Sequence, residues 1–461
     1  MCGIAGYASS KPTSLATSIV LSILIELQHR GQESAGLATV SPDGYIEVRS
    51  GRGTVIEALL NGLTVDMSHR DVFGAIAHTR YSTSGGYMDS VPQPIVIGNG
   101  DYRFALAVNG TIANYKMLAK TFGIEGNYND AQVLANVLYR LALEHNRDVI
   151  EALKSFSEIA VGGYSVVILT SEPRLVIARD PYGFRPLAYS YNDEEIAVAS
   201  ETAALDVVGY NNWAEVGAGE IISFDGKSLE RTHSITATFS PCAFEYVYIS
   251  RLDSVFNNVN IYTARVQMGY ELSKMMPVEA DIVVPVPDSG RGAAIGYSRG
   301  SGIPLEEGLV INRYLGRGFI LPPGLRDVVA KLKYGFIKTA IQGKKVILVD
   351  DSIVRGTTMA AIASRLRKYG AKEVHIRISS PPFRYPCFMG IDIASRSELL
   401  AWRKMDLVDI ASYLNADTVA YNTVENIVKS IGINTLCLAC FTGAYPFKGL
   451  GVEDLEEMFS R

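Results

Sequence analysis

The hydrophobic pattern of this 461-residue chain changes about half-way along, and the change indicates two different kinds of domain. From residue 1 to about 235, short runs with alternating apolar residues, such as EIAVAS, lie between Gly and Asp/Asn turns, with helical patterns at 13–31 and 130–145. This half is typical of a largely antiparallel α+β domain. From about 275 onward, continuous apolar strands followed by helices predict a parallel α/β sheet. Between the halves, residues 241–276 predict a connecting strand and a long helix.

Composition excludes several classes of partner. A formal net charge of −5 gives no basic footprint, so a nucleic-acid partner is not implied. The apolar runs are far shorter than the ~20 residues needed to span a bilayer, and the amino end lacks a signal-peptide pattern. We therefore expect a cytoplasmic protein with reduced thiols, whose five cysteines are catalytic or metal-binding rather than disulfide-bonded.

The strongest local signal is the stretch VILVDDSIVRGTTMAA. An apolar strand (346–349) delivers Asp350 and Asp351 to the carboxyl end of the predicted sheet, where ligands of open α/β folds bind. Two adjacent carboxylates repel each other unless a cation or hydroxyl groups offset the repulsion. The glycine turn that follows, with Thr357 and Thr358 opening a helix, is typical of a phosphate cradle. The competing interpretation, a solvated acidic turn that caps a helix, explains one aspartate but not the pair.

A cysteine at position 2 indicates a second kind of chemistry. Its small side chain favours removal of Met1, which would leave Cys2 with a free α-amine of ordinary pKa near ~8 beside its own thiol. Nucleophile and base would then lie on one residue, as in N-terminal nucleophile enzymes. For a cysteine taken alone, the competing interpretation, a small buried apolar residue, is the more common one.

Further motifs carry a family resemblance. The strand, acidic pair and Gly-Thr-Thr loop resemble the signature of type I phosphoribosyltransferases, which bind 5-phosphoribosyl 1-pyrophosphate. Five stretches resemble the class II glutamine amidotransferases: CGIAG, HRGQESAG, HTRYST, NGTIAN and RDPYGFRPL. In this order, and over nearly the whole chain, the motifs resemble the glutamine phosphoribosylpyrophosphate amidotransferase family.

The resemblance implies a fold for each half. Residues 1–235 would form an α+β domain of the N-terminal nucleophile hydrolase type, with αββα layers and glutamine amidotransferase activity. Residues 236–461 would form an α/β type I phosphoribosyltransferase domain with a parallel sheet and a C-terminal cluster-binding extension.

The implied reaction is the first step of de novo purine synthesis. Ammonia from glutamine is transferred to 5-phosphoribosyl 1-pyrophosphate, which gives 5-phosphoribosylamine, glutamate and pyrophosphate. The alternative is a non-enzymatic or weakly active paralogue that senses phosphoribosyl pyrophosphate or purine nucleotides. The loop at 350–358 argues against a glucosamine-phosphate or asparagine synthetase, which would share only the first half.

The resemblance also assigns roles to residues of the first half. Cys2 would attack the glutamine amide, and Asn109 with Gly110 would form the oxyanion hole. Arg80 would pair with the α-carboxylate of glutamine, and Asp130 would recognise its α-amine.

In the second half, Asp350 and Asp351 match residues that hold the ribose hydroxyls and a magnesium ion, with Ser289 as a third residue of the metal site. Arg291 would belong to the turn that binds the pyrophosphate, and Lys333 would bind the phosphoribosyl substrate from the loop that closes over it. The 5-phosphate would bind to four residues in a row: Arg355, Gly356, Thr357 and Thr358.

The other four cysteines form a separate set: Cys242, Cys387, Cys437 and Cys440. Only the pair in CLAC has the spacing of a metal knuckle, and from the residues alone a four-cysteine zinc site competes with an iron–sulfur cluster. The resemblance implies the iron–sulfur branch, with a structural or oxygen-sensing 4Fe-4S cluster on all four thiolates.

One loop departs from the family pattern. In residues 317–336, Gly318 replaces a threonine, the stretch before Arg326 is one residue short, and Gly335 stands at the position of an asparagine, while the aligned Lys333 is kept. Closure of such a loop completes the site and excludes water, so these changes bear on phosphoribosyl transfer. The resemblance further implies purine nucleotides as feedback inhibitors and a homo-oligomer, either a dimer or a tetramer.

Overall fold

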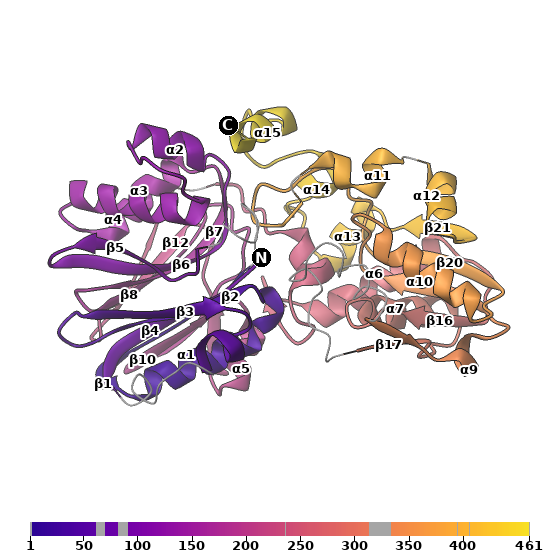
Figure 1. The fold of residues 1–461 in the computed structure, drawn as a ribbon, viewed down its shortest axis with the longest axis horizontal. Coiled ribbons are helices and arrows are strands. Elements are labelled where there is room, and N and C mark those ends of the chain that lie inside the picture. Colours follow the sequence, from indigo (N-terminus) through magenta and orange to yellow (C-terminus); the bar gives the residue numbers. More distant parts are fainter. Residues whose placement is uncertain are drawn as a thin grey trace. The chain divides into compact units, whose positions relative to one another are not determined.

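The computed structural model describes residues 2–60, 70–81, 91–235, 237–312, 333–393, 395–404 and 406–460. The chain divides into two compact units (Figure 1). The first unit consists of Met1–Cys242, Cys387–Ala394 and Tyr445–Arg461, and the second of Ala243–Pro386 and Ser395–Ala444. Within the described ranges, no helix is both long enough and apolar enough to cross a membrane.

Two antiparallel sheets form the centre of the first unit. In the described residues, the strand orders are β11-β9-β10-β1-β4-β2-β3 and β13-β12-β8-β7-β6-β5. The first sheet contains β1 (Gly3–Thr13), β2 (Ser34–Val40), β3 (Ile46–Arg52), β4 (Val72–Arg80), β9 (Ala188–Asn192), β10 (Glu195–Ala199) and β11 (Trp213–Glu215). The second contains β5 (Ile95–Asn99), β6 (Tyr102–Ile112), β7 (Gly162–Thr170), β8 (Arg174–Arg179), β12 (Glu220–Phe224) and β13 (Leu229–His233).

Helices cover the outer faces of both sheets. The first sheet packs against α1 (Leu15–Glu26) and α5 (Thr202–Val207), and the second against the layer of α2 (Tyr115–Thr121), α3 (Asp130–Glu144) and α4 (Val149–Ile159) (Figure 1). Alternate residues of the strands, such as Ile4, Ile76 and Val167, fill the space between the sheets. The expected αββα layers and both predicted helices are confirmed. The 3-10 turn η1 (Gln28–Arg30) follows α1, and the short π-helical turn η2 (Ile56–Leu60) follows β3.

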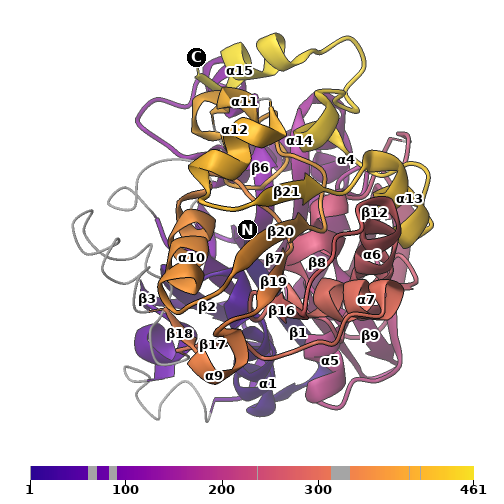
Figure 2. The same cartoon turned by 90° about the vertical axis from the view of Figure 1, so that its right-hand side faces the viewer.

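A parallel sheet in the order β16-β19-β20-β21 forms the centre of the second unit (Figure 2). Its strands are β16 (Ile282–Pro285), β19 (Lys345–Asp350), β20 (Glu373–Ile378) and β21 (Thr418–Tyr421). Two small antiparallel pairs accompany it, β14 (Val255–Phe256) with β15 (Val259–Asn260) and β17 (Leu309–Ile311) with β18 (Tyr334–Phe336). The helical segments are η4 (Glu245–Ile249), α6 (Ile261–Met275), α7 (Arg291–Ser301), α9 (Lys338–Ile341), α10 (Thr357–Lys368), η6 (Arg396–Glu398), α11 (Leu400–Arg403), α12 (Leu407–Tyr413), α13 (Val424–Ile431) and α14 (Ala439–Thr442).

Helices pack on both faces of β19, which explains its unbroken apolar sequence. Ile347 and Val349 lie in the cluster with α6 and α7, while Val346 and Leu348 lie in the cluster with α10. A strand buried on both faces needs apolar residues at consecutive positions. The carboxyl end of β19 at Asp350 therefore marks the point where the chain leaves the core and polar groups become available.

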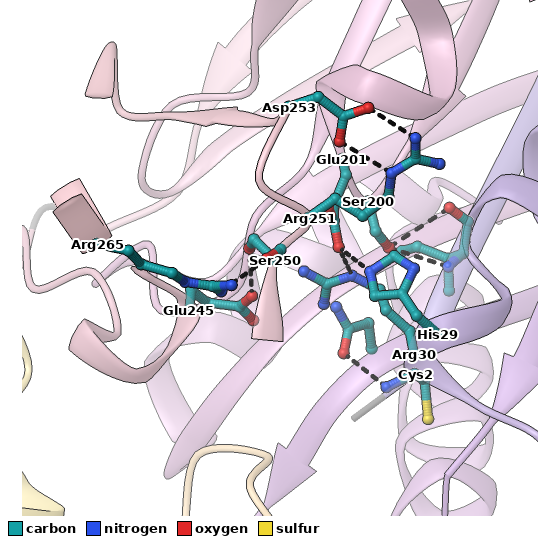
Figure 3. A network of polar contacts seen from close by, with 12 residues as sticks. Cys2, His29, Arg30, Ser200, Glu201, Glu245, Ser250, Arg251, Asp253 and Arg265 are labelled. Carbon is teal, nitrogen blue, oxygen red and sulfur yellow. Dashed lines mark hydrogen bonds and ion pairs between the residues drawn. The ribbon is translucent and has the colours of Figure 1, made fainter. Parts of the chain in front are cut away.

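The connection before α6 differs from the sequence prediction. The long helix is confirmed, whereas the expected connecting strand is reduced to the two short strands β14 and β15, and residues 245–249 form the π-helical turn η4. Arg265 of α6 is buried and donates to the carbonyl oxygens of Tyr246 at 2.7 Å and Ser250 at 2.7 Å (Figure 3). Ser250 also donates to the Glu245 carboxylate at 2.8 Å. These contacts satisfy carbonyl groups of the turn that a strand would have paired in a sheet.

Two segments from the C-terminal half pack in the first unit, whereas the sequence prediction gave all of 236–461 to the second domain. Aromatic contacts hold them there. The Phe388 ring lies 5.5 Å from Tyr445 and 5.9 Å from Phe459, which belongs to α15 (Val452–Ser460). Phe447 lies 5.8 Å from Phe184 between centroids. Such pairs bury large apolar areas, so these segments are part of the first unit's core.

Candidate active sites

The amino end of β1 places Cys2 between the two sheets of the first unit. Its backbone N–H donates to Oδ1 of Asn109 at 3.2 Å, and its thiol donates to the carbonyl oxygen of Tyr81 at 3.6 Å. Cys2 is 6% exposed, so the thiol is nearly covered but reachable from one side. The strands bring together two residues that are 107 positions apart, a nucleophile and an amide.

Asn109 has a hydrogen-bond donor to spare. Its side chain is fully buried in β6, and its Nδ2 group has no hydrogen-bond partner in the part of the chain that the structure describes. Leaving a buried donor unsatisfied costs about 1–3 kcal/mol, so its retention calls for an acceptor that arrives with a ligand. A negatively charged oxygen that forms next to Cys2 is such an acceptor.

Gly110 follows Asn109 in a conformation that suits glycine. Its φ is +156°, and a Cβ atom there would lie 2.0 Å from the carbonyl oxygen of Gly163 on the neighbouring strand β7. Any side chain would therefore push β6 and β7 apart. The backbone at Gly110 is held at a fixed distance from β7, which suits a group that must present donors in a set position.

Arg80 and Asp130 flank this centre from other elements. The β1–β4 register pairs Gly3 with Thr79, so Arg80 lies one position further toward Cys2. Arg80 is buried, and its Nε has no partner among the described residues, while its Nη1 lies 3.5 Å from the carbonyl oxygen of Val91. A buried guanidinium with donor capacity left over suits a carboxylate ligand.

Asp130 is the first residue of α3, whose start is fixed by the capping box of Asn129 and Gln132. Its Oδ2 accepts the N–H of Ile112 at 3.3 Å, two residues beyond Gly110. The structure thus holds a nearly buried carboxylate close to the Asn109–Gly110 backbone, where it could pair with a ligand's ammonium group.

Behind Cys2 lies a polar network whose pairing the sequence did not reveal (Figure 3). Ile4 donates its N–H to Ser200 Oγ at 3.0 Å, and the buried Glu201 accepts from Arg30 and from His29 Nε2, the latter at 2.7 Å. Breaking a buried ion pair of this kind costs about 3–5 kcal/mol. His29 and Arg30 lie in the quoted motif HRGQESAG, but nothing in the sequence pointed to a partner 171 residues away. The network holds the strand end that carries Cys2.

His78 is a second group that the sequence analysis passed over. It is fully buried on β4, and burial, with a smaller effect from the charge of Arg80, lowers its pKa from 6.5 to about 3. The imidazole is therefore neutral at physiological pH. A neutral ring leaves Arg80 as the cation on this part of the strand.

In the second unit, the acidic pair lies where β19 ends. Asp350 Oδ1 accepts the N–H of Asp351 at 2.9 Å, and Asp351 is buried. Burial, and then the neighbouring charge of Asp351, raise the pKa of Asp350 well above its usual range, and the charge of Lys333 opposes this rise. The Lys333 ammonium lies 5.1 Å from the ring of Tyr334. Two carboxyl groups that resist joint ionisation suit a divalent cation, because its charge removes the repulsion.

The turn that begins α7 packs directly against this acidic end. A Cβ atom at Gly290 would lie 2.6 Å from the carbonyl oxygen of Val349 and 3.1 Å from the Cα of Asp350. Only glycine allows so close an approach. Ser289 and Arg291, on either side, are thereby brought next to Asp350, and Arg291 forms ion pairs with Glu307 at 3.1 Å and with Asp288 at 3.4 Å.

The loop between β19 and α10 has the form of an anion cradle. Gly356 has φ +83°, and a Cβ there would lie 2.7 Å from Leu400. Thr357 and Thr358 are exposed at the start of α10, where backbone N–H groups favour phosphate. Arg355 is also exposed, and its Nε donates to Glu398 at 3.0 Å, a partner that the sequence did not suggest.

Of the loop that departs from the family pattern, residues 313–332, including Gly318 and Arg326, lie outside the described residues. Lys333 and Gly335 are described: Gly335 pairs with Val310 in the β17–β18 ladder, and Lys333 interacts electrostatically with Asp350. The structure therefore brings together the acidic pair, the Ser289 turn and Lys333.

Of the four remaining cysteines, Cys242 and Cys387 belong to the first unit, and Cys437 and Cys440 belong to the second. All five cysteines are in the described part of the chain, and none forms a disulfide there. In the described ranges, no three His, Cys, Asp or Glu side chains gather into a group that could hold a metal ion. The Sγ of Cys387 accepts the N–H of Met389 at 3.4 Å, a contact that stabilises a thiolate.

Comparison with known proteins bears on both units. Residues 78–207 match the family described as glutamine amidotransferase domain, and residues 268–379 the family described as phosphoribosyl transferase domain. The amidophosphoribosyltransferase of Pyrococcus horikoshii is 41% identical over 449 residues, covering 96% of each chain. That of Bacillus subtilis is 40% identical, covering 96% of this chain and 94% of its own.

A solved structure is similar over the same length. It is the glutamine phosphoribosylpyrophosphate amidotransferase of B. subtilis complexed with ADP and GMP, with a TM-score of 0.86, 36% identity, and 98% of this chain and 100% of that chain covered. Both family matches and the full-length relatives agree with the two folds described above. The chain belongs to the amidophosphoribosyltransferase family.

Proposed function

We propose that the first unit releases ammonia from glutamine at Cys2 and that the second unit uses this ammonia to displace pyrophosphate from 5-phosphoribosyl 1-pyrophosphate. The products are glutamate, pyrophosphate and 5-phosphoribosylamine, and the reaction is the first step of purine synthesis. The observation that carries the proposal is the contact of Cys2 with Asn109, whose second amide donor is buried without a partner among the described residues.

In the first half-reaction, the Cys2 thiolate adds to the side-chain amide carbon of glutamine. The negative charge that develops on the amide oxygen is stabilised by Asn109 Nδ2 and the backbone at Gly110. Once Met1 is removed, the α-amine of Cys2 takes the place of the N–H that now faces Asn109, and it carries the thiol proton to the departing ammonia. Water then hydrolyses the thioester to glutamate.

Glutamine is oriented by its other end. Arg80, buried and with an Nε donor to spare in the described part of the chain, pairs with the α-carboxylate, and Asp130 pairs with the α-ammonium. These two groups recognise an amino acid and exclude a simple amide.

In the second half-reaction, ammonia attacks C1 of the ribose as the C1–O bond to pyrophosphate breaks. Asp350 and Asp351 would hold the ribose hydroxyls and, together with Ser289, a magnesium ion, which when bound would supply positive charge next to the pyrophosphate group. Arg291 binds the pyrophosphate and Lys333 contributes to binding the phosphoribosyl substrate, while the 5-phosphate is bound by Arg355, Gly356, Thr357 and Thr358. The raised pKa of Asp350 supports the cation assignment.

We further propose a 4Fe-4S cluster on Cys242, Cys387, Cys437 and Cys440, with a structural or oxygen-sensing role. The four thiols and their sequence contexts support it, as does the N–H group donated to Cys387 Sγ. Anaerobically purified protein should then be brown and contain four iron and four sulfide per chain, to within experimental error. A colourless protein with one zinc per chain would contradict the proposal.

Purine nucleotides are proposed as feedback inhibitors, and a homo-oligomer as the assembly. The solved relative that is complexed with ADP and GMP supports the first proposal. Inhibition of phosphoribosylamine formation by added GMP and ADP, and the mass of the protein by light scattering, test the two proposals separately.

The main test measures glutamate release from glutamine with and without 5-phosphoribosyl 1-pyrophosphate and Mg²⁺, together with phosphoribosylamine formation from glutamine or from ammonia. Cys2→Ala should abolish both glutamine-dependent reactions and keep the ammonia-dependent one. The alternative, a non-enzymatic sensor, predicts binding of phosphoribosyl pyrophosphate or nucleotide without either product.

A further inference from the structure

The backbone at Gly110 is confined on a second side, by a short turn that comes from the far end of the sequence. A Cβ atom at Gly390 would lie 3.0 Å from the Cα and 3.3 Å from the carbonyl carbon of Gly110. Both residues belong to the first unit. Gly110 is therefore enclosed between the Gly163 carbonyl of β7 and the backbone of Gly390, with no room for a side chain at either contact.

Gly163, on the strand next to Gly110, makes a similar contact with the same turn. A Cβ at Gly163 would lie 3.0 Å from the Cβ of Met389 and 2.7 Å from the ring of Phe184. Residues 389 and 390 thus cover adjacent points of the β6–β7 pair, one over Gly163 and the other over Gly110. Close packing of this kind transmits small displacements, because the interior has no free volume to absorb them.

The turn that carries these residues is itself fixed. We call residues 387–393 the Cys387 turn. The N–H of Cys387 donates to the carbonyl oxygen of Ile393 at 2.9 Å, and the N–H of Met389 donates to Cys387 Sγ at 3.4 Å. Phe388 anchors the turn between Tyr445 and Phe459. The sulfur of Cys387 therefore lies one hydrogen bond away from the residues that cover Gly110 and Gly163.

We infer that the Cys387 turn forms the back wall of the oxyanion hole, with Met389 and Gly390 as positioning residues that set where the Gly110 backbone lies. This rests on the proposed function, in which Gly110 serves that hole. In the contacts given for the described residues, Met389 and Gly390 touch neither the thiol of Cys2 nor Arg80 or Asp130, the groups proposed to bind the ends of glutamine. Moving it should therefore weaken stabilisation of the transition state and leave binding of glutamine unchanged.

Gly390→Ala tests the inference, because its new Cβ would press on the Cα of Gly110. The matched control is Gly209→Ala, which lies in the same unit, has a comparable positive φ (+94° against +106°) and has nothing within 4 Å of its Cβ position. Both variants carry the same kind of backbone strain, but only the first presses on the oxyanion backbone.

We expect Gly390→Ala to lower kcat for glutamine hydrolysis about tenfold or more, with KM for glutamine within about twofold of the unaltered protein. Inhibition by glutamate γ-semialdehyde, whose aldehyde carbon accepts the Cys2 thiolate to give a tetrahedral oxyanion, should weaken by the same factor. Gly209→Ala should change neither quantity by more than about twofold. Ammonia-dependent phosphoribosylamine formation, measured in each preparation, checks that the protein is folded.

The outcomes separate the two proposals. If the unaltered protein releases no Cys2-dependent glutamate, the proposed function and this inference both fall. If it does, and Gly390→Ala matches Gly209→Ala or raises KM alone, the inference is overturned while the function stands. If the alanine variant does not fold, Met389→Gly repeats the comparison, since it removes the Cβ atom that lies against Gly163 and adds no atom to the site.

Discussion

The two candidate sites are built in opposite ways. At Cys2, the functional groups are buried between two sheets, the glycine at position 110 is enclosed by backbone on two sides, and the polar groups point inward with donors unused in the described residues. At Asp350, the groups proposed to bind phosphate lie at the starts of α7 and α10 and in the turns before them, several of them are exposed, and Arg291 and Arg355 are paired with carboxylates of the same unit. The first site is assembled before its substrate arrives, whereas the second must exchange internal partners for its ligand.

The largest effect should follow removal of the nucleophile. Cys2→Ala should lower glutamine-dependent phosphoribosylamine formation at least a thousandfold, because it removes the thiol that attacks the amide. Ammonia-dependent formation should stay within about twofold, measured in the same assay with ammonium chloride at pH 8. Loss of both activities would mean that the two sites do not function independently, which would contradict the contrast drawn between them.

Asn109→Ala should have the second-largest effect. It should lower kcat for glutamine hydrolysis about 10²–10³-fold and leave KM nearly unchanged, since an oxyanion donor acts in the transition state. Steady-state kinetics of glutamate release measures both constants. An equal change in KM would show that Asn109 binds the ground state, and the buried unused donor would need another explanation.

The exclusion of water from the first site can be tested through the protonation of His78. Its folded-state pKa of about 3 lies below its ordinary value of 6.5, so the unfolded chain takes up the extra proton and stability falls as pH falls below about 6.5. Between pH 7 and pH 5 this loss should reach about 2 kcal/mol, and His78→Gln should remove it. Urea unfolding of both proteins at the two pH values is the measurement. An imidazole that titrates near 6.5 by NMR would show that water reaches the site.

The smallest effect concerns Arg355. Glu398→Gln should lower KM for 5-phosphoribosyl 1-pyrophosphate up to about fivefold, because an exposed ion pair contributes up to about 1 kcal/mol and the phosphate no longer has to displace it. Glu425→Gln, a change of the same charge at another helix start of the second unit, serves as control. A higher KM in Glu398→Gln would show that the Glu398 carboxylate orients Arg355 for the ligand. The second site would then be preorganised for its substrate, as the first is.

Much of each site could be predicted because local patterns encode it. The apolar strand that ends in Asp350, the glycine turn after it and the helix at 130–145 are short-range signals, and the structure contains all three. The π-helical turn at 245–249 was not predicted, because Arg265, which satisfies the carbonyl oxygens of Tyr246 and Ser250, comes from a different element.

Long-range pairings were beyond the sequence pattern. Glu201 with Arg30, Glu398 with Arg355 and Gly390 with Gly110 join segments 171, 43 and 280 positions apart, and nothing in the sequence around one residue of a pair points to the other. The packing of 387–394 and 445–461 in the first unit could not be predicted for the same reason, because it depends on contacts between a few aromatic side chains that are far apart in the sequence.

The pair of Arg355 with Glu398 has a consequence for how binding responds to salt. A lone arginine that captures a phosphate releases no ion held by the protein, so its affinity falls steeply as ionic strength rises. Here one anion replaces another on the same guanidinium, and salt weakens the internal pair along with the external one. The affinity of the loop for the proposed 5-phosphate should therefore depend less on ionic strength than the charge of the loop alone implies. Glu398 thus reduces the salt dependence of ligand binding.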